Sequence, residues 1–371
     1  MKKIITLLLL SIVSICFGQI PTGYYNSATG TGFTLKTQLK TRITTGHSDQ
    51  GYGSLWTLYT TSAFRDNYYE NDGTLLDFYS ENPTGPDTYN FSSTSQQCGN
   101  YSNEGDCYNR EHLIPQAYFD NVAINPMKND PFHVVPSDGK VNGLRDNYPF
   151  GRVNTANTTT ANGSKLGANL NSGYSAGYAG TVFEPVDAFK GDIARCFFYF
   201  ATRYQDQMGD FYNAATVQSK NMFDGTNDNV FSPTFINILL TWHNQDPVSA
   251  IEIAKNNAIY TYQGNRNPFI DHPEYVCQIW TSACAALSTP SMEYAEIAIY
   301  PNPSKNHKVT INSTIVIDDI QLISVNGQLI MEIKNPVFNN NSYSVENLPQ
   351  GFYFLRLSNE NQSTIRKIII N

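Results

Sequence analysis

The run Cys107-Tyr-Asn-Arg-Glu-His-Leu-Ile-Pro115 is followed later in the chain by Val141-Asn-Gly-Leu-Arg-Asp-Asn147. The first run places a carboxylate beside an imidazole, and the second supplies an amide and an arginine. A neutral imidazole can deprotonate water, and carboxylate and amide oxygens can hold a hard cation such as Mg²⁺. A cation so held polarises a phosphoryl oxygen, and an arginine neutralises charge in the transition state. Together the two runs contain the parts needed for metal-assisted phosphodiester hydrolysis.

The adjacency of Glu111 and His112 restricts the local structure. Neighbouring residues on a regular strand point to opposite faces. The two side chains can therefore converge on one phosphate only at a strand end, a bend or a bulge. Pro115 follows closely, which favours a strand that ends here.

The composition of the whole chain excludes several classes of protein. The 371 residues suffice for two domains, and the 40% hydrophobic content excludes wholesale disorder. The net charge of −8 argues against a basic nucleic-acid coat protein. Residues 19–287 alone carry 16 Lys and Arg against 25 Asp and Glu, so binding of a polyanion would depend on a local basic groove.

The N-terminus has the pattern of a targeting segment. Lys2 and Lys3 precede an apolar run from Ile4 to Ile15, which is the length of a signal-peptide core. We expect residues 1–18 to be a signal peptide and the mature chain to have no membrane span. A lipoprotein signal at Cys16 is the alternative, disfavoured because Ile15 stands where a small residue is needed.

The cysteines fit an oxidising compartment. Two pairs lie close in sequence, Cys98 with Cys107 and Cys277 with Cys284, and each pair is a disulfide candidate. Cys196 lies in an apolar helical stretch and is expected to be a buried free thiol. Zinc binding is disfavoured, because neither pair has the Cys-x2-Cys spacing and no pair of histidines accompanies them.

The hydrophobic pattern changes near residue 288. Before it, apolar spacing predicts helices at 193–204 and 235–242, and the polar stretch 154–182 predicts a long loop. Residues 288–298 are the expected linker. After it, alternating residues predict a small β-sandwich over 299–371, whose strands are expected at 308–312, 320–324, 328–333, 352–357 and 364–370.

The tail resembles the sorting domain of cargo for the type IX secretion system. The resemblance rests on Tyr300-Pro-Asn-Pro303, Asn326-Gly-Gln-Leu329, Leu348-Pro-Gln-Gly-Phe-Tyr-Phe354 and the ending Lys367-Ile-Ile-Ile-Asn371. It implies export across an outer membrane by that machinery, so the protein is expected outside the cell or on its outer surface. The alternative is a carbohydrate-binding or adhesive β-sandwich.

The preceding part resembles the bacterial endonuclease I family of extracellular or periplasmic nucleases. The matching pieces occur in order and are Asn109-Arg-Glu-His112, Asp130-Pro-Phe-His-Val-Val-Pro136, Val141-Asn-Gly-Leu-Arg145 with Tyr148-Pro-Phe-Gly151, Phe183-Glu-Pro185, Lys190-Gly-Asp-Ile-Ala-Arg195 through Arg203-Tyr204, and Gln263-Gly-Asn-Arg-Asn-Pro-Phe269. The resemblance implies an α+β fold. It consists of a ββα-metal nuclease domain at 19–287, mainly helical with a small β-hairpin core, followed by the small Ig-like β-sandwich.

The resemblance also implies roles for individual residues. His112 matches the general base, and Glu111 and Asn142 match the ligands of one divalent cation, with Mg²⁺ as first choice and Mn²⁺ or Ca²⁺ as alternatives. The hairpin would carry Glu111 and His112, and a helix starting near Gly139 would carry Asn142. Residues expected to support them from behind are Asp130, His133 and Asn109.

The arginine that stabilises the phosphate is less clearly marked. Arg145 is the candidate and Arg110 the alternative, while a scaffold ion pair is the competing role for Arg145. Further basic residues that would either contact nucleic acid or pair with acids are Lys128, Lys140, Arg152, Arg195 and Arg266.

The function expected from these observations is a secreted, metal-dependent endonuclease with little sequence preference. It would hydrolyse DNA, or RNA, to 5′-phosphate products and act as a monomer. The competing function is an exported binding or adhesion protein on an inactive nuclease scaffold. A metallopeptidase or other hydrolase is disfavoured, because no His-Glu-x-x-His or Gly-x-Ser-x-Gly motif occurs near the candidate site.

Overall fold

The computed structural model describes residues 20–371 except 93, 288–296, 315, 326 and 360–361. The expected signal peptide at 1–18 and nearly all of the expected linker at 288–298 lie outside the described residues. The chain divides into two compact units, the first ending at Cys284 and the second beginning at Ala285. None of the described helices is long and apolar enough to cross a membrane.

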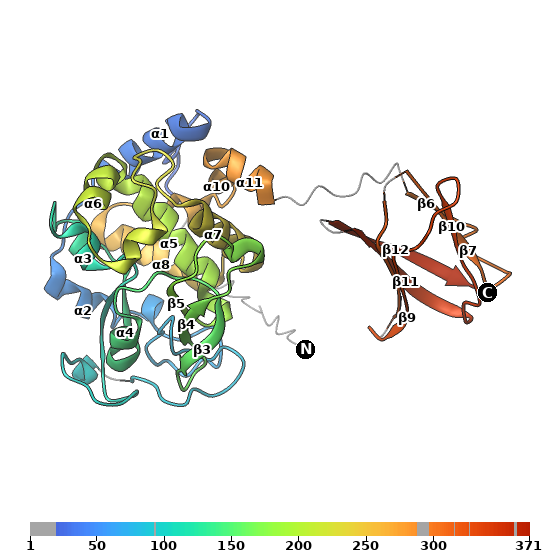
Figure 1. The fold of residues 1–371 in the computed structure, drawn as a ribbon. Coiled ribbons are helices and arrows are strands. Elements are labelled where there is room, and N and C mark those ends of the chain that lie inside the picture. Colours follow the sequence, from blue (N-terminus) through green and yellow to red (C-terminus); the bar gives the residue numbers. More distant parts are fainter. Residues whose placement is uncertain (1–19, 93, 288–296, 315, 326, 360–361) are drawn as a thin grey trace, which may run out of the picture. The chain divides into compact units, whose positions relative to one another are not determined.

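The first unit is built mainly from helices, with two small sheets (Figure 1). The helices of the chain are α1 (Gly32–Thr44), α2 (Leu55–Leu58), α3 (Gln116–Phe119), α4 (Gly139–Arg145), α5 (Lys190–Arg203), α6 (Met208–Ala214), α7 (Pro233–Gln245), α8 (Ala250–Gln263), α9 (Pro268–Asp271), α10 (Tyr275–Ile279) and α11 (Thr281–Leu287). The predicted helices at 193–204 and 235–242 are confirmed as α5 and α7.

Helix α5 forms the core of this unit. It is buried along almost its whole length and packs against α7 and α1. A helix that is apolar on most sides is stable only inside a domain, which explains its central place in Figure 1. The neighbouring helix α7 is capped by Ser232, whose hydroxyl accepts from the Phe235 N–H. Pro233 occupies the first turn of α7, where its missing N–H costs no hydrogen bond.

Two small sheets complete the first unit. Strands β1 (Tyr108–His112) and β2 (Val134–Asp138) pair antiparallel, with Glu111 opposite Val135. Strands β3 (Val153–Thr159), β4 (Lys165–Asn169) and β5 (Thr181–Glu184) form the second sheet in sequence order.

The long loop predicted at 154–182 is wrong, because β3, β4 and the start of β5 occupy much of it. The side chains of β3 are exposed at nearly every position, so no alternation of apolar residues marked it as a strand. Its threonines are β-branched and suit an extended backbone without burial.

Both predicted disulfides are confirmed. Cys98 bonds to Cys107, and Cys277 in α10 bonds to Cys284 in α11. Cys196 in α5 is a free cysteine, as expected, but it is partly rather than fully buried.

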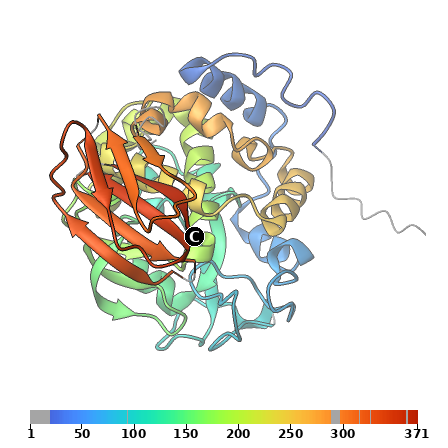
Figure 2. The same ribbon diagram turned by 90° about the vertical axis from the view of Figure 1, so that its right-hand side faces the viewer.

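The second unit consists of two antiparallel sheets. The strands are β6 (Ile297–Tyr300), β7 (Val309–Ser313), β8 (Asp319–Ser324), β9 (Leu329–Lys334), β10 (Ser342–Val345), β11 (Gly351–Asn359) and β12 (Gln362–Ile370), in the orders β10-β7-β6 and β12-β11-β8-β9. Figure 2 presents these strands, in orange to red, from a second side. The five predicted strands are confirmed as β7, β8, β9, β11 and β12, whereas β6 and β10 were not predicted.

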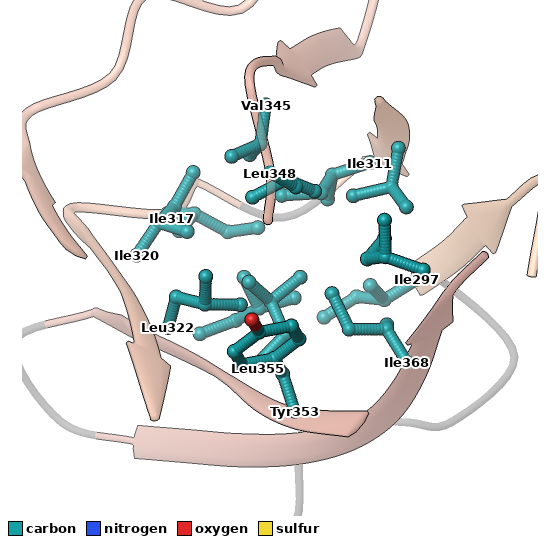
Figure 3. Close-up of a cluster of buried hydrophobic side chains, with 13 residues drawn as sticks. Ile297, Ile311, Ile317, Ile320, Leu322, Val345, Leu348, Tyr353, Leu355 and Ile368 are labelled. Atoms are coloured by element: carbon teal, nitrogen blue, oxygen red, sulfur yellow. The ribbon is translucent and has the colours of Figure 1, made fainter. Parts of the chain in front are cut away.

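One hydrophobic cluster joins the two sheets of this unit (Figure 3). Ile311 of β7 and Val345 of β10 come from one sheet, and Leu322, Leu355 and Ile368 come from the other. Leu355 and Ile368 are fully buried. The alternation of buried and partly buried residues along β7 and β8 is that of strands with one face on a core.

Candidate active site

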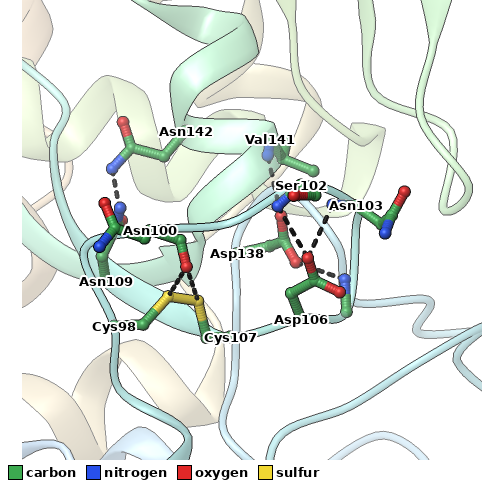
Figure 4. The surroundings of a disulfide bond; sticks show 11 residues. Cys98, Asn100, Ser102, Asn103, Asp106, Cys107, Asn109, Asp138, Val141 and Asn142 are labelled. Carbon is green, nitrogen blue, oxygen red and sulfur yellow. Dashed lines mark hydrogen bonds between the residues drawn. A yellow bond between two sulfur atoms is a disulfide. The ribbon is translucent and has the colours of Figure 1, made fainter.

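Local backbone structure brings the two sequence runs together. The Cys98–Cys107 disulfide lies immediately before β1, and α4 starts directly after β2 (Figure 4). Asp138 caps the start of this helix, because its carboxylate accepts from the Val141 N–H at 2.8 Å. The same carboxylate also accepts from the Gly105 N–H at 2.7 Å, which ties the loop before β1 to the helix. The order of strand, strand and helix therefore sets β1 beside the helix that carries Asn142.

Glu111, His112 and Asn142 line one cavity of about 380 Å³. His112 is the last residue of β1. Ending the strand there lets the adjacent Glu111 and His112 reach the same cavity, which a longer regular strand would prevent. Arg110 and Arg145 line the same cavity.

The Glu111 carboxylate is almost fully buried and held from one side. Its Oε1 accepts from the Tyr79 hydroxyl and from Nη1 of Arg145, each at 2.8 Å. Burial raises the pKa of Glu111 to about 7, against the opposing effect of the Arg145 charge. The second carboxylate oxygen accepts no hydrogen bond from the described residues, so it is available to a ligand in the cavity.

The His112 ring is fixed in one tautomer. Its Nε2 lies 3.1 Å from the carbonyl oxygen of Lys128. Because a carbonyl can only accept, Nε2 carries the proton and Nδ1 is left with a free lone pair. Burial, reinforced by the neighbouring His133, lowers the pKa of His112 to about 3, so the ring is neutral at physiological pH.

The Asn142 amide is oriented by a neighbour on β1. Its Nδ2 donates to Oδ1 of Asn109 at 2.7 Å (Figure 4). This hydrogen bond uses the amide nitrogen and leaves the amide oxygen as the group that can bind a cation. Asn109 is thus placed where a supporting residue was expected.

Arg145 is buried beside Glu111 and is held by several hydrogen bonds. The side chain is 1% exposed, and its guanidinium donates to Glu111 and to the carbonyls of His112 and Leu113 at 2.6–2.9 Å. The guanidinium also lies 4.7 Å from the ring of Phe150. These contacts hold the end of β1 against α4.

Two other cations meet beside His112, over the ring of Tyr52. The guanidinium of Arg110 lies 3.3 Å from the Tyr52 ring centroid and donates to the Tyr52 carbonyl at 2.7 Å. The Lys128 ammonium lies 4.8 Å from the same ring, and the ring itself stacks on His112 with centroids 5.8 Å apart. We refer to Tyr52, Arg110 and Lys128 as the Tyr52 cluster.

Asp130 and His133 are buried behind the site. The Asp130 carboxylate accepts from the Tyr199 and Tyr204 hydroxyls and from Gln263 at 2.7–2.9 Å. His133 is fully buried, with Nε2 2.7 Å from the Met127 carbonyl and its ring 5.8 Å from that of His112. Burial lowers the pKa of His133 to about 4, so it is neutral like His112.

The remaining basic residues lie in different surroundings. Lys140 is exposed on α4, and Arg152 is half-buried with its guanidinium 5.1 Å from the ring of Tyr174. Arg195 and Arg266 are buried and form ion pairs with Glu252 and Asp271, respectively. Those two arginines therefore lie within the scaffold, and neither lines the cavity.

Sequence reasoning missed two tyrosines of the site. Tyr79 contacts Glu111, and Tyr52 organises the two cations beside His112. Both come from segments well before β1, and no spacing pattern connects them to it. Tyr79 is fully buried, so it supports Glu111 from within the domain.

Comparison with known proteins identifies a family for each of the two units. Residues 31–274 match the family model described as Endonuclease I, and residues 298–371 match the one described as Secretion system C-terminal sorting domain. The tail and the relatives below place the chain among secreted or cell-surface proteins.

Two relatives and one solved structure illustrate the extent of similarity. The chain is 32% identical over 263 residues to an extracellular ribonuclease of Bacillus amyloliquefaciens, and 34% identical over 266 residues to one of Bacillus subtilis (strain 168). Each comparison covers 69% of this chain and 78% of the relative. The sulfur carrier protein SoxY from Chlorobium limicola matches 25% of this chain and 96% of its own at 16% identity, and its TM-score of 0.16 is too low to indicate a shared fold.

The family model covers about two thirds of the chain, and two relatives exceed 30% identity over most of their length. The chain belongs to the endonuclease I family and is a nuclease with a C-terminal secretion-sorting domain.

Proposed function

We propose that this nuclease is a metal-dependent endonuclease in which His112 is the general base and Glu111 and Asn142 hold one divalent cation. The observation that most directly supports this proposal is that the Glu111 carboxylate, the Asn142 amide and the neutral His112 imidazole, whose tautomer is fixed, line a single cavity. In this proposal β1, β2 and α4 form a ββα-metal motif, and the two sheets of the tail form an Ig-like sandwich that serves type IX secretion.

The donor atoms suit a hard cation. Glu111 offers one carboxylate oxygen free of hydrogen bonds among the described residues, and Asn142 offers an amide oxygen turned away from Asn109. Such an all-oxygen pair leaves several positions to water and phosphate, which is how Mg²⁺ is usually bound. When bound, Mg²⁺ would polarise a phosphoryl oxygen and stabilise the leaving 3′-oxygen.

His112 supplies the base chemistry in this proposal. Its Nε2–H is held by the Lys128 carbonyl, so the Nδ1 lone pair takes a proton from water. The resulting hydroxide attacks phosphorus opposite the 3′-oxygen, the P–O3′ bond breaks, and the leaving 3′-oxygen takes a proton from water. The products therefore carry a 5′-phosphate and a 3′-hydroxyl. The low pKa of the imidazole ensures that the base is unprotonated before substrate binds.

The basic residues near the cavity have different roles in this proposal. The guanidinium of Arg145 donates to Glu111 and to two backbone carbonyls, so we propose that Arg145 positions Glu111. Arg110 uses one of its five N–H groups on Tyr52 and lines the cavity, and Lys128 lies beside it. The Tyr52 cluster is therefore our candidate for phosphate contact, with Lys140 and Arg152 as more distant contributors.

Both RNA and DNA are proposed as substrates. The two relatives are named extracellular ribonucleases, which supports RNA, and contacts to phosphate do not depend on sequence or base. We propose that the enzyme acts as a monomer after export directed by a signal peptide at 1–18.

A cleavage assay on the full chain tests this proposal. Supercoiled DNA and single-stranded RNA are incubated with Mg²⁺, Mn²⁺, Ca²⁺ or EDTA, for the wild type, Asn142→Ala and the control Asn157→Ala, an exposed asparagine of β3 outside the cavity lining. Cleavage that requires a divalent cation, persists in Asn157→Ala and is lost in Asn142→Ala at low Mg²⁺ supports the assignment. If the folded wild type cleaves neither substrate with any cation, the proposal fails and an inactive exported binding protein is favoured.

A further inference from the structure

A second group of carboxylates lies outside the catalytic cavity. An antiparallel bridge between Arg65 and Leu75 closes a loop that contains Asp66 and Glu70, and Glu81 follows on a later turn. One carboxylate oxygen from each of Asp66, Glu70 and Glu81 lies within 4.8 Å of the other two. That is the largest separation possible for two ligands about 2.4 Å from the same ion, the bond length typical of Ca²⁺.

The Glu81 carboxyl group is buried among other acids. Its side chain is 1% exposed, and neither of its oxygens accepts a hydrogen bond from the described residues. No ion pair to Asp66, Glu70 or Glu81 is present in the part of the chain that the structure describes. Buried carboxylates are normally paired or bound to a metal, because an isolated buried charge is strongly unfavourable. Burial and the neighbouring acids raise the pKa of Glu81 to about 9.

The nearby cations do not supply the missing charge. Arg65 donates to the carbonyls of Phe91 and Ser92 rather than to a carboxylate. Lys255 interacts with Glu81 electrostatically, but it interacts more strongly with Asp192 and lies 4.0 Å from the ring of Phe78. Without a cation the group therefore relies on protonation of Glu81, and a divalent cation from solution would replace that proton.

The Asp66 carboxylate is held in place for a ligand. It is fully buried, and it accepts from the N–H groups of Tyr68, Tyr69 and Asn71 at 2.6–3.0 Å. The N–H of Asp72 donates a fourth, longer hydrogen bond at 3.4 Å. A carboxylate has about four lone pairs, so the three short hydrogen bonds fix its orientation, and a cation would replace the fourth, long one.

We propose that Asp66, Glu70 and Glu81 form a second divalent-cation site, which binds Ca²⁺. All three donors are oxygens, and neither histidine nor cysteine is among them, which disfavours zinc. Glu70 is exposed, so the site is open to solvent on that side. An exported protein meets Ca²⁺ at concentrations where extracellular sites with Kd values of about 10⁻⁴–10⁻³ M are filled.

Occupancy of this site would also steady the catalytic centre. The turn that ends at Glu81 carries Tyr79, which donates to Glu111, and Asp77, which accepts from the backbone N–H of Asp138 at 2.7 Å. A cation that ties Glu81 to the Asp66 loop therefore fixes the segment that supports both Glu111 and the start of α4. The role is structural and does not depend on the catalytic proposal.

The test is the effect of Ca²⁺ on thermal unfolding of the EDTA-stripped full chain. Four proteins are compared, the wild type, Glu111→Gln, Glu81→Gln and Glu70→Gln. Glu111→Gln removes the carboxylate of the catalytic centre, so a Ca²⁺ response that it retains arises elsewhere. Luminescence of bound Tb³⁺, sensitised by Tyr68 and Tyr69 within the loop, reports occupancy directly in the same four proteins.

Ca²⁺ at about a hundredfold excess over its Kd is expected to raise Tm by about 5–10 °C in the wild type and in Glu111→Gln. Glu81→Gln should lose this response, yet unfold in EDTA no earlier than the wild type, because Glu81 is already protonated and uncharged when no cation is bound. Glu70→Gln alters an exposed residue and should weaken Ca²⁺ binding at least tenfold without a folding defect. A full Ca²⁺ response in both Glu81→Gln and Glu70→Gln, or no response in Glu111→Gln, overturns the proposal.

Discussion

Replacing Arg145 by methionine separates a scaffold role from a role at the phosphate. Arg145 and Glu111 are 1% and 2% exposed, and their ion pair is 2.8 Å long. Removing one partner of a buried pair costs about 3–5 kcal/mol, because the other charge is left unpaired. The same change also removes the hydrogen bonds to the His112 and Leu113 carbonyls.

We therefore expect Arg145→Met to lower Tm by roughly 6–20 °C, at about 2–4 °C per kcal/mol for a domain of this size. The variant should also need more Mg²⁺ for half-maximal cleavage, because Glu111 is no longer held. Thermal unfolding in EDTA and a Mg²⁺ titration of the cleavage rate measure the two effects. The control is Arg152→Met, because Arg152 is half-buried and lies outside the cavity lining. The free energy of unfolding of this variant should differ from that of the wild type by no more than about 0.5 kcal/mol.

A double-mutant cycle with Glu111→Gln strengthens the result. The Arg145→Met/Glu111→Gln protein should be less destabilised than the sum of the single variants, by about 1–3 kcal/mol, because no buried charge is left unpaired. The reasoning is refuted if Arg145→Met keeps the wild-type Tm within about 1 °C and still loses cleavage at saturating Mg²⁺. That outcome would place the guanidinium at the phosphate instead.

Four further predictions concern other parts of the chain. Asn109→Ala should raise the Mg²⁺ concentration for half-maximal cleavage about 10–100-fold, and an unchanged titration would remove its orienting role. The pKa of His112 is lowered to about 3 and that of Glu111 is raised to about 7, so a fall in cleavage rate below pH 7 should reflect protonation of Glu111 and should be relieved by added Mg²⁺. A fall in rate at low pH that is the same at every Mg²⁺ concentration contradicts this. Deleting residues 288–371 should leave the cleavage rate and the Tm of the first unit unchanged, and a drop in either measurement would show that the units depend on each other. Leu355→Ala should destabilise the second unit by about 2–5 kcal/mol in denaturant unfolding without altering cleavage, and a smaller loss would mean that the cluster can collapse around the gap.

Elements with strong apolar patterns were predictable from the sequence. Helix α5 is apolar on most sides and α7 has regular helical spacing, so both were identified with nearly correct bounds. Strand β3 was missed because its exposed, threonine-rich sequence lacks the alternation that one buried face produces. Strands β6 and β10 were missed because each has only 4 residues, too few for an alternating pattern to be recognised.

The site could be predicted where its residues are close in sequence. The run from Asn109 to His112 was identified as one functional unit, and Asn142 was added through the family resemblance. The role of Arg145 stayed open because an ion pair and a phosphate contact require the same charge, and only burial distinguishes them. Tyr52 and Tyr79 reach the site through tertiary packing, which leaves no signal in the spacing of residues.

The central claim is that His112 is the base of a metal-dependent nuclease, and one rate comparison tests it most directly. Initial cleavage rates at saturating Mg²⁺ are measured for the wild type and His112→Ala, each shown to be folded by thermal unfolding. The account predicts a loss of about 10²–10⁴-fold with little change in the Mg²⁺ concentration for half-maximal rate. A folded His112→Ala protein that cleaves within tenfold of the wild-type rate would contradict it.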